Sequence, residues 1–277
     1  MADRIGLDLI SVLGMPPVDY VALAGELGCT HITLAPKPVV AVPELYANWT
    51  FHGNPGLLRD TKAALADHGI TVAGGEGFFI VPGRDVADSV ADLDILAELG
   101  TDAVTACAFE PDQTRALDQL AVLAELAAAR GMGANIEFVP GLAIGDLPTA
   151  LAAVRHVGRP GFGIVVDAMH IYRSGSTAAD VAAIDPAIIG HIQLCDVPVA
   201  VAAEGYGYEA SFERLCPGDG ELPLAELVAA LPRDHLIALE VPMKARALAG
   251  ESPADRLRPC VEAVRGLIAR ARSAATA

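Results

Sequence analysis

The sequence predicts a single (β/α)8 barrel of the TIM type, one domain covering residues 1–277. Strand-like and helix-like segments alternate eight times along the chain. The strand candidates are apolar on both faces, as expected for parallel strands that helices cover on one side and a barrel interior on the other. A length of 277 residues suits one closed barrel, and no linker divides the chain.

The elements follow from apolar runs that end at glycine or proline. The expected strands are Ile5–Ser11, His31–Ala35, Ile70–Glu76, Asp102–Ala108, Ala134–Val139, Gly161–Asp167, Ile188–Cys195 and His235–Val241. The expected helices are Val18–Leu27, Gly56–His68, Asp85–Leu99, Asp112–Arg130, Leu147–Val157, Ala178–Ala183, Leu222–Leu231 and Pro253–Arg272. A doubly wound open sheet is the alternative, but Ser11–Gly14 is not the glycine-rich turn it would need after the first strand.

Composition excludes several classes of protein. Lysine and arginine number 19 against 35 acidic residues, so the net charge is −16. Such a charge repels nucleic acid and anionic lipid. No apolar run is long enough to cross a membrane, and residues 1–5 lead directly into a strand, so we expect a cytoplasmic protein without a signal peptide. The five cysteines form no CxxC pair and are expected to be reduced.

Four oxygen-bearing side chains end successive strand candidates. They are Glu137, Asp167, Gln193 and Glu240, with 30 and 26 residues between the first three and 47 before the last. The short intervals match one β/α repeat, and the long one matches a repeat plus an extended loop up to Glu221. Because side chains alternate along a strand, all four are expected to face the barrel interior at its carboxyl end.

Three carboxylates and one amide oxygen predict a site for a divalent cation. Without a cation, three inward anions would repel one another strongly in a cavity of low dielectric constant. All-oxygen ligands favour Mn²⁺, Mg²⁺ or Co²⁺ over Zn²⁺. The ion would polarise a hydroxyl or carbonyl group of a bound polyol. Glu137 and Glu240 could then remove a proton next to the carbonyl and return it.

Further residues are candidates for roles around this ring. His170 is expected in the loop beyond the sixth strand, as a catalytic or structural group. Arg214 precedes a Pro-Gly-Asp-Gly turn and could bind an anion or a hydroxyl group. His191 could support Gln193 or Glu240, or contact substrate. The last candidates are Glu76, Asp8 and Asp196, the first two lining the pocket and the third capping a loop or supporting the site.

Five segments resemble the xylose isomerase-like sugar phosphate isomerase/epimerase superfamily, which also contains endonuclease-IV-type repair enzymes. These segments are Glu137–Pro140, Asp167–His170, His191–Asp196, Arg214–Leu222 and Leu239–Pro242. In its ketose 3-epimerases, a Glu, Asp, His, Glu ring binds Mn²⁺ or a similar ion. There the two glutamates are the acid/base pair, and an arginine approaches substrate. The resemblance carries these roles onto Glu137, Glu240 and Arg214. Gln193 stands where these epimerases have the metal-binding histidine. A glutamine at this position is similar to the 3-dehydroshikimate dehydratases of the same superfamily, whose ring is Glu, Asp, Gln, Glu.

Four functions compete on these observations. The first is a metal-dependent isomerase or epimerase acting on a keto-sugar, polyol or small hydroxy-ketone. The second is a lyase that forms the same enolate and expels a β-hydroxyl group. An endonuclease-IV-like phosphodiesterase is disfavoured by the charge and by only seven histidines, and a non-catalytic barrel leaves the anionic ring unexplained. The apolar helices Asp85–Leu99 and Asp112–Arg130 suggest a homodimer as a hypothesis.

Overall fold

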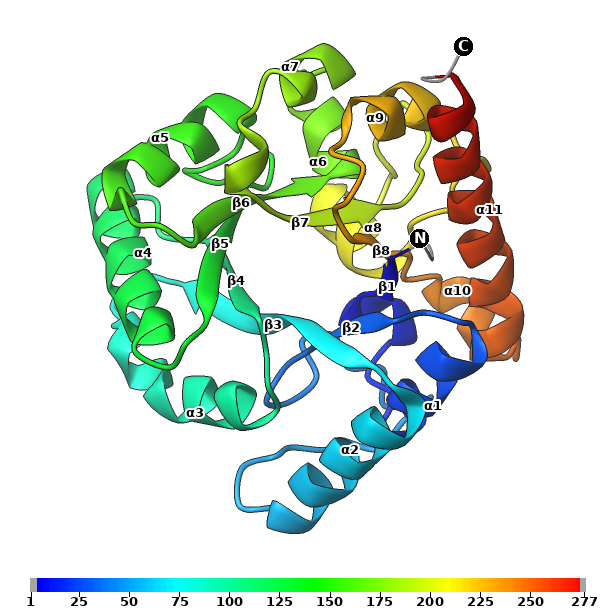
Figure 1. Ribbon diagram of the computed structural model, residues 1–277, viewed down its shortest axis with the longest axis horizontal. Coiled ribbons are helices and arrows are strands. Elements are labelled where there is room, and N and C mark those ends of the chain that lie inside the picture. Colours follow the sequence, from blue (N-terminus) through cyan, green and yellow to red (C-terminus); the bar gives the residue numbers. More distant parts are fainter. Residues whose placement is uncertain (1–3, 275–277) are drawn as a thin grey trace.

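Eight parallel strands form a closed barrel in this computed structural model, which describes residues 4–274. Each strand pairs with its neighbours in the sequence, and β8 (Ile237–Leu239) closes the ring against β1 (Ile5–Leu7). Helices surround the strands, as Figure 1 shows looking along the barrel. The predicted barrel fold is confirmed. Residues 1–3, on which part of the signal-peptide expectation rests, lie outside the described chain.

The remaining elements alternate as the barrel requires. The other strands are β2 (His31–Leu34), β3 (Thr71–Ile80), β4 (Ala103–Ala108), β5 (Gly133–Glu137), β6 (Phe162–Asp167) and β7 (Ile189–Leu194). The helices are α1 (Pro17–Glu26), α2 (Pro55–His68), α3 (Val90–Glu98), α4 (Gln113–Ala128), α5 (Leu147–Val157), α6 (Ala168–Arg173), α7 (Ala178–Ala182), α8 (Tyr206–Phe212), α9 (Leu224–Ala230), α10 (Lys244–Leu248) and α11 (Pro253–Ala274). Short 3-10 helices are η1 (Leu9–Val12), η2 (Val86–Ser89) and η3 (Pro186–Ile188).

Polar side chains and glycines determine where several helices begin and end. The Asp146 carboxylate accepts a hydrogen bond from the Thr149 amide at 2.8 Å, and the Asp146 amide donates to the Thr149 hydroxyl group. Helix α5 therefore begins with a capping box. Gly69 and Gly158 end α2 and α5 in the left-handed conformation, which glycine adopts without a steric cost. These local signals explain why the predicted bounds of both helices are within one residue of the observed bounds.

The structure corrects the sequence-based elements in several places. The third strand continues to Ile80 rather than ending at Glu76, and the helix expected over Asp85–Leu99 is divided into η2 and α3. The first strand ends at Leu7 rather than Ser11, because residues 9–12 form η1. A helix, α6, begins directly after Asp167, whose carboxylate caps it by accepting from the His170 amide at 2.8 Å. His170 therefore lies in a helix and not in a loop. The segments expected to be loops after β7 and β8 contain the short helices α8 and α10.

A β-bulge near the end of β3 changes the direction in which its side chains point. The pairing of β3 with β4 shifts register between Gly75 and Phe78, so Glu76 and Gly77 have no partners across the strands. Gly77 has a φ of +95°, which a residue with a Cβ rarely adopts. Bulges of this kind bend a strand and change the direction of its side chains. Here the bulge places Glu76 and Phe79 at the carboxyl end of the barrel, where both line a cavity.

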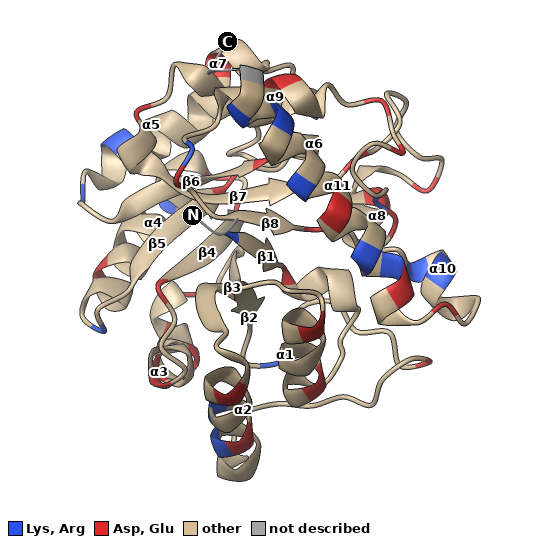
Figure 2. Cartoon of the chain, turned by 45° about the vertical axis from the view of Figure 1, so that its right-hand side comes forward, with Lys and Arg blue, Asp and Glu red and all other residues tan. Residues whose placement is uncertain are grey.

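Charged residues are unevenly distributed along the chain. Acidic residues occur on elements all around the barrel, whereas lysine and arginine are most frequent on α10 and α11, with others on α2 and α5 (Figure 2). Within residues 4–274, no helix combines the length and the apolar character needed to cross a membrane.

The residues that pack against β6 leave no room for a side chain at Gly163. A Cβ placed there would lie 2.6 Å from the carbonyl oxygen of Ile188 and 3.1 Å from Oδ1 of Asn135. We expect Gly163→Ala to destabilise the protein by about 1–3 kcal/mol, because the backbone must move to relieve the overlap. Gly207→Ala on α8 is the control, since nothing lies within 4 Å of a Cβ there. Urea unfolding should separate the two variants, and equal midpoints would contradict this account.

Candidate metal centre and active site

The four side chains of the predicted ring lie at the same end of the barrel. Glu137 and Asp167 are the last residues of β5 and β6, Gln193 is in β7, and Glu240 directly follows β8. Asp167 and Gln193 are partners across neighbouring strands. Asp167, Gln193 and Glu240 are buried and Glu137 is partly buried. The structure thus brings together residues separated by up to 103 positions in the chain.

Glu137, Asp167 and His170 form the tightest group of potential ligands. One atom from each side chain lies within 4.8 Å of the others. His170 Nε2 is 3.3 Å from Oε1 of Glu137, and its Nδ1 is 3.8 Å from Oδ1 of Asp167. Carboxylates and an imidazole at this spacing can hold a divalent ion. His170 is therefore a further candidate ligand, although the sequence placed it beyond the ring.

The side chains of Gln193 and Glu240 are hydrogen-bonded to each other beside this group. Gln193 Nε2 donates to Oε1 of Glu240 at 2.9 Å. The other amide atom, Gln193 Oε1, is buried and has no hydrogen-bond partner among the described residues. A buried acceptor without a donor is unusual in a folded protein and suits a cation. The donor set is thus compatible with a divalent metal.

Arg214 neutralises two of the three carboxylates in this structure. Its Nη1 is 2.6 Å from Oδ2 of Asp167 and 2.7 Å from Oε2 of Glu240, while its Nε donates to the Ala210 carbonyl at 2.7 Å. Only 3% of Arg214 is exposed, so it lies among the carboxylates rather than on a loop over them. Burial works against the charged form of Asp167, but Arg214 and His170 outweigh it and lower the pKa of that carboxyl to about 2.

The pKa of Glu240 is shifted in the opposite direction from that of Asp167. Burial raises the pKa of Glu240 well above its usual range, and the nearby Arg214 opposes this shift only in part. The neighbouring Glu137 and Asp167 carboxylates raise the pKa further. A carboxylate with other anions close by resists a negative charge, so the charged form of Glu240 depends on a neighbouring cation.

Tyr206 is a site residue that the sequence did not indicate. Its hydroxyl group hydrogen-bonds to Nδ1 of His170, and the two rings are 5.7 Å apart. Tyr206 begins α8, within a segment that was expected to be an irregular loop. A tyrosine between glycines, Gly205 and Gly207, was the only signal in the sequence. This contact leaves Nε2 of His170 directed at Glu137.

One cavity of about 410 Å³ connects these groups. Glu137, His170, Arg214, Glu240 and Tyr206 all contribute to its wall. Its position at the carboxyl ends of the strands is where barrel enzymes bind substrate.

Comparison with known proteins agrees with this geometry. The model of the xylose isomerase-like TIM barrel family matches residues 21–260. The chain belongs to this family. It is 26% identical over 199 residues to the 3-dehydroshikimate dehydratase of Pseudomonas aeruginosa, covering 67% of this chain but only 31% of that longer protein.

Solved structures share the fold of this family member. The IOLI protein with a bound zinc atom superposes with a TM-score of 0.80 at 16% identity, covering 96% of this chain and 98% of the other. A probable 3-DHS dehydratase from Bacillus anthracis gives 0.72 at 17% identity, over 95% and 98% of the chains. An L-ribulose 3-epimerase gives 0.73 at 15% identity, over 99% and 97%.

The remaining candidates lie near the centre with partners of their own. His191 Nε2 is 3.0 Å from Oδ2 of Asp8, so its partner is neither Gln193 nor Glu240 as the sequence suggested. Burial opposes protonation of His191, but Asp8 outweighs it and raises the pKa. Glu76 accepts a hydrogen bond from the Thr33 hydroxyl group. Burial and the Asp8 charge raise the pKa of Glu76 to about 8.

Asp196 caps the loop that carries Arg214. Its Oδ1 accepts from the amides of Val197 and Leu222 at 2.9 and 3.0 Å, and its Oδ2 accepts from Gly218 at 2.9 Å. The expectation of a loop cap is confirmed. Three backbone bonds to one buried carboxylate fix the loop, and the fixed loop positions the arginine.

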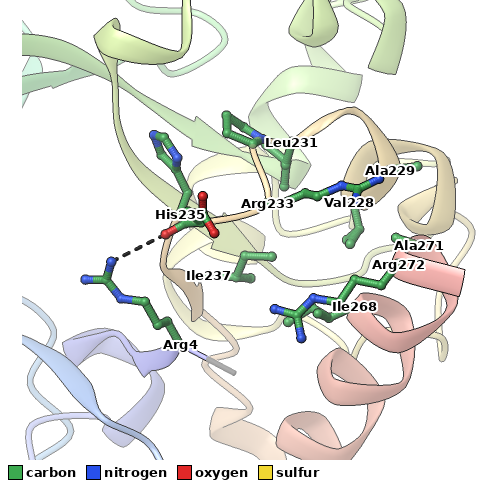
Figure 3. A pocket seen from close by; sticks show the side chains of 12 residues that line it. Arg4, Val228, Ala229, Leu231, Arg233, His235, Ile237, Ile268, Ala271 and Arg272 are labelled. Carbon is green, nitrogen blue, oxygen red and sulfur yellow. Dashed lines mark hydrogen bonds between the residues drawn. The ribbon is translucent and has the colours of Figure 1, made fainter. Parts of the chain in front are cut away.

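A second cavity, of about 240 Å³, lies at the amino-terminal end of the barrel (Figure 3). Its wall includes Arg4, Arg233, His235 and Arg272, and Arg4 donates to the Asp234 carbonyl at 3.4 Å. None of the predicted site residues contributes to it. In barrel enzymes, this end serves stability rather than chemistry.

Removing the guanidinium of Arg214 should destabilise the metal-free protein. Arg214→Met leaves Asp167 and Glu240 buried without the guanidinium that pairs with both, so we expect a loss of about 3 kcal/mol or more in the free energy of unfolding. Added Mn²⁺ should restore part of this loss. Lys62→Met is the control, because the Lys62–Glu98 pair is exposed and such pairs contribute about 0–1 kcal/mol. Equal losses in the two variants would show that Arg214 does not balance the buried charge.

Proposed function

We propose that this protein is a divalent-metal-dependent isomerase or epimerase that acts on a keto-sugar, polyol or related small hydroxy-ketone. The observation that carries the proposal is the gathering of three carboxylates and one unpartnered amide oxygen at the carboxyl end of the barrel, beside a cavity that Glu137 and Glu240 line. Proteins rarely bury such a group of anions without a function for it. Membership in a family with epimerase and dehydratase neighbours supports an enzyme of this kind.

Glu137, Asp167, Gln193 and Glu240 would hold the metal, with His170 as a further candidate ligand. When bound, a divalent ion such as Mn²⁺, Mg²⁺ or Co²⁺ would polarise the substrate carbonyl and stabilise an enediolate. Its charge would also compensate the carboxylates that Arg214 neutralises in the present structure. The bound zinc of the IOLI protein supports a metal in this fold, but it does not identify the ion used here.

Glu137 and Glu240 are the proposed acid/base pair. They reach the cavity from β5 and from the end of β8, three strands apart in the barrel. Substrate between them could lose a proton from carbon to one carboxylate and regain a proton from the other. If His170 does not bind the metal, its Nε2, which lies 3.3 Å from Glu137, would instead hydrogen-bond the substrate oxygen while Nδ1 keeps its contact with Tyr206. Arg214, which also lines the cavity, would hydrogen-bond a hydroxyl group of the substrate.

A lyase is the second candidate, and Gln193 is the observation that favours it. A glutamine at this position is similar to the 3-dehydroshikimate dehydratases, and the chain matches one of them over 199 residues. The lyase would form the same enolate and expel a β-hydroxyl group. The two reactions differ in whether the carbon or the departing oxygen is protonated. A proton delivered from His170 to that oxygen would produce the elimination.

Glu240→Gln should abolish turnover and leave the fold intact. The amide cannot accept a proton, so we expect proton exchange to fall by at least about 100-fold. The measurement is deuterium uptake from D₂O, followed by mass spectrometry, in a panel of keto-sugars and 3-dehydroshikimate with Mn²⁺-loaded protein. Deuterium next to the carbonyl with a new epimer or aldose supports the isomerase, and loss of water supports the lyase.

The control is Glu226→Gln, an exposed glutamate on α9 that should exchange at the native rate. Removing the metal with a chelator should stop exchange in both the native protein and the control. A folded Glu240→Gln variant with full activity would overturn the acid/base assignment. Full activity in metal-free protein would overturn the metal dependence.

A further inference from the structure

We propose that Phe79 and Phe109 bind an apolar ring carried by the substrate. On this account the enzyme selects a hydroxy-ketone with a large apolar substituent, in preference to a free or phosphorylated sugar. The inference rests on the proposed function, because the two phenylalanines line the same cavity as Glu137, His170 and Glu240. It adds a specificity site that the chemistry itself does not require.

Two exposed aromatic rings stand side by side at the mouth of the cavity. Phe79 is 45% exposed and Phe109 is 49% exposed. Their ring centroids are 5.6 Å apart, and the planes meet at 76° in an edge-to-face arrangement. The described chain has few large apolar side chains this exposed, namely Phe79, Phe109, Val199, Val201 and Leu248. Exposed aromatic groups gathered at a cavity mark a binding surface more often than isolated ones do.

Rigid strands fix the positions of both rings. Phe79 lies near the end of β3 and pairs with Cys107 of β4, and Phe109 directly follows β4. The bulge at Glu76 and Gly77 shifts the register just before Phe79. Side chains on neighbouring strands at the same barrel end form a preorganised surface, which loses little freedom when a ligand binds.

Apolar residues continue this surface around the mouth. The cavity wall also contains Val39, Val40, Val139, Pro140 and Leu142. Polar and charged groups gather instead at the strand ends, around Glu137 and Glu240. The cavity therefore offers a polar region for a hydroxy-ketone and an apolar region for what is attached to it. Ligand sites commonly combine a mostly apolar wall with a few placed polar groups.

Charge argues against a phosphate or carboxylate on the part of the substrate near the mouth. Among the described residues, Arg214 is the one lysine or arginine that lines the cavity, and it lies at the strand ends beside Asp167 and Glu240 rather than among the apolar residues of the mouth. The carboxylic acids of the wall are Glu76, Glu137 and Glu240. The mouth therefore offers an anionic group no lysine or arginine, whereas an uncharged ring would contact apolar side chains there.

Binding of unreactive glycosides tests the proposal without turnover. The probes are phenyl β-D-glucopyranoside, methyl β-D-glucopyranoside and glucose 6-phosphate, measured by calorimetry with Mn²⁺-loaded native protein. We expect the phenyl glycoside to bind at least about tenfold more tightly than the methyl glycoside. Phe79→Ala and Phe109→Ala should remove most of this difference, because they weaken binding of the phenyl glycoside by a larger factor than binding of the methyl glycoside. Leu248→Ala, exposed on α10 away from the cavity, should preserve it.

Several results would overturn the inference. They are equal affinities for the phenyl and methyl glycosides, tighter binding of glucose 6-phosphate, or no binding of the phenyl glycoside at about 10 mM. Thermal unfolding checks that each alanine variant is folded, and Phe79→Leu and Phe109→Leu, which keep apolar bulk, should retain part of the preference. If the protein prefers the phenyl glycoside but exchanges deuterium into no hydroxy-ketone, the proposed function is contradicted. The aromatic binding site at Phe79 and Phe109 would still be supported.

Discussion

The burial of three carboxylates at one end of the barrel is the constraint on which the site depends. Asp167 and Glu240 share the guanidinium of Arg214, and Glu137 contacts His170. Isolated anions would be strongly destabilising there, so each must have a cation or a hydrogen-bond donor close by. Asp196 fixes the loop that carries Arg214 by accepting hydrogen bonds from the amides of Gly218 and Leu222, and this loop holds the guanidinium between the two carboxylates. A divalent ion would take over the same electrostatic role and release the arginine for substrate.

The barrel topology makes this concentration of charge feasible. Parallel strands present their carboxyl ends at one edge, and alternation directs every second side chain inward. Residues on β5, β6, β7 and β8 therefore meet without any long-range motif in the sequence. The same rule places Phe79 and Phe109 at the mouth, since β3 and β4 end at that edge. One cavity therefore has two regions, a polar one around Glu137 and Glu240 and an apolar one around Phe79 and Phe109.

Much of the fold and of the ring could be predicted from the sequence, because both follow from local patterns. Apolar runs with terminal glycines located the strands, and a carboxylate or amide at each strand end located Glu137, Asp167, Gln193 and Glu240. The contacts of Arg214, Tyr206 and His191 could not be predicted. They depend on how the segment between β7 and α9 folds back and on which side chains meet across the barrel, as His191 meets Asp8 from 183 positions away. No local periodicity encodes such contacts.

The central claim is that the four strand-end side chains bind one divalent ion. The most direct test is a crystal structure of the protein soaked in Mn²⁺, with anomalous scattering to locate the metal. The account predicts one strong peak at about 2.0–2.6 Å from oxygen atoms of Glu137, Asp167, Gln193 and Glu240, with the Arg214 guanidinium displaced toward the cavity. A peak elsewhere, or no peak with Arg214 still between Asp167 and Glu240, would contradict the account.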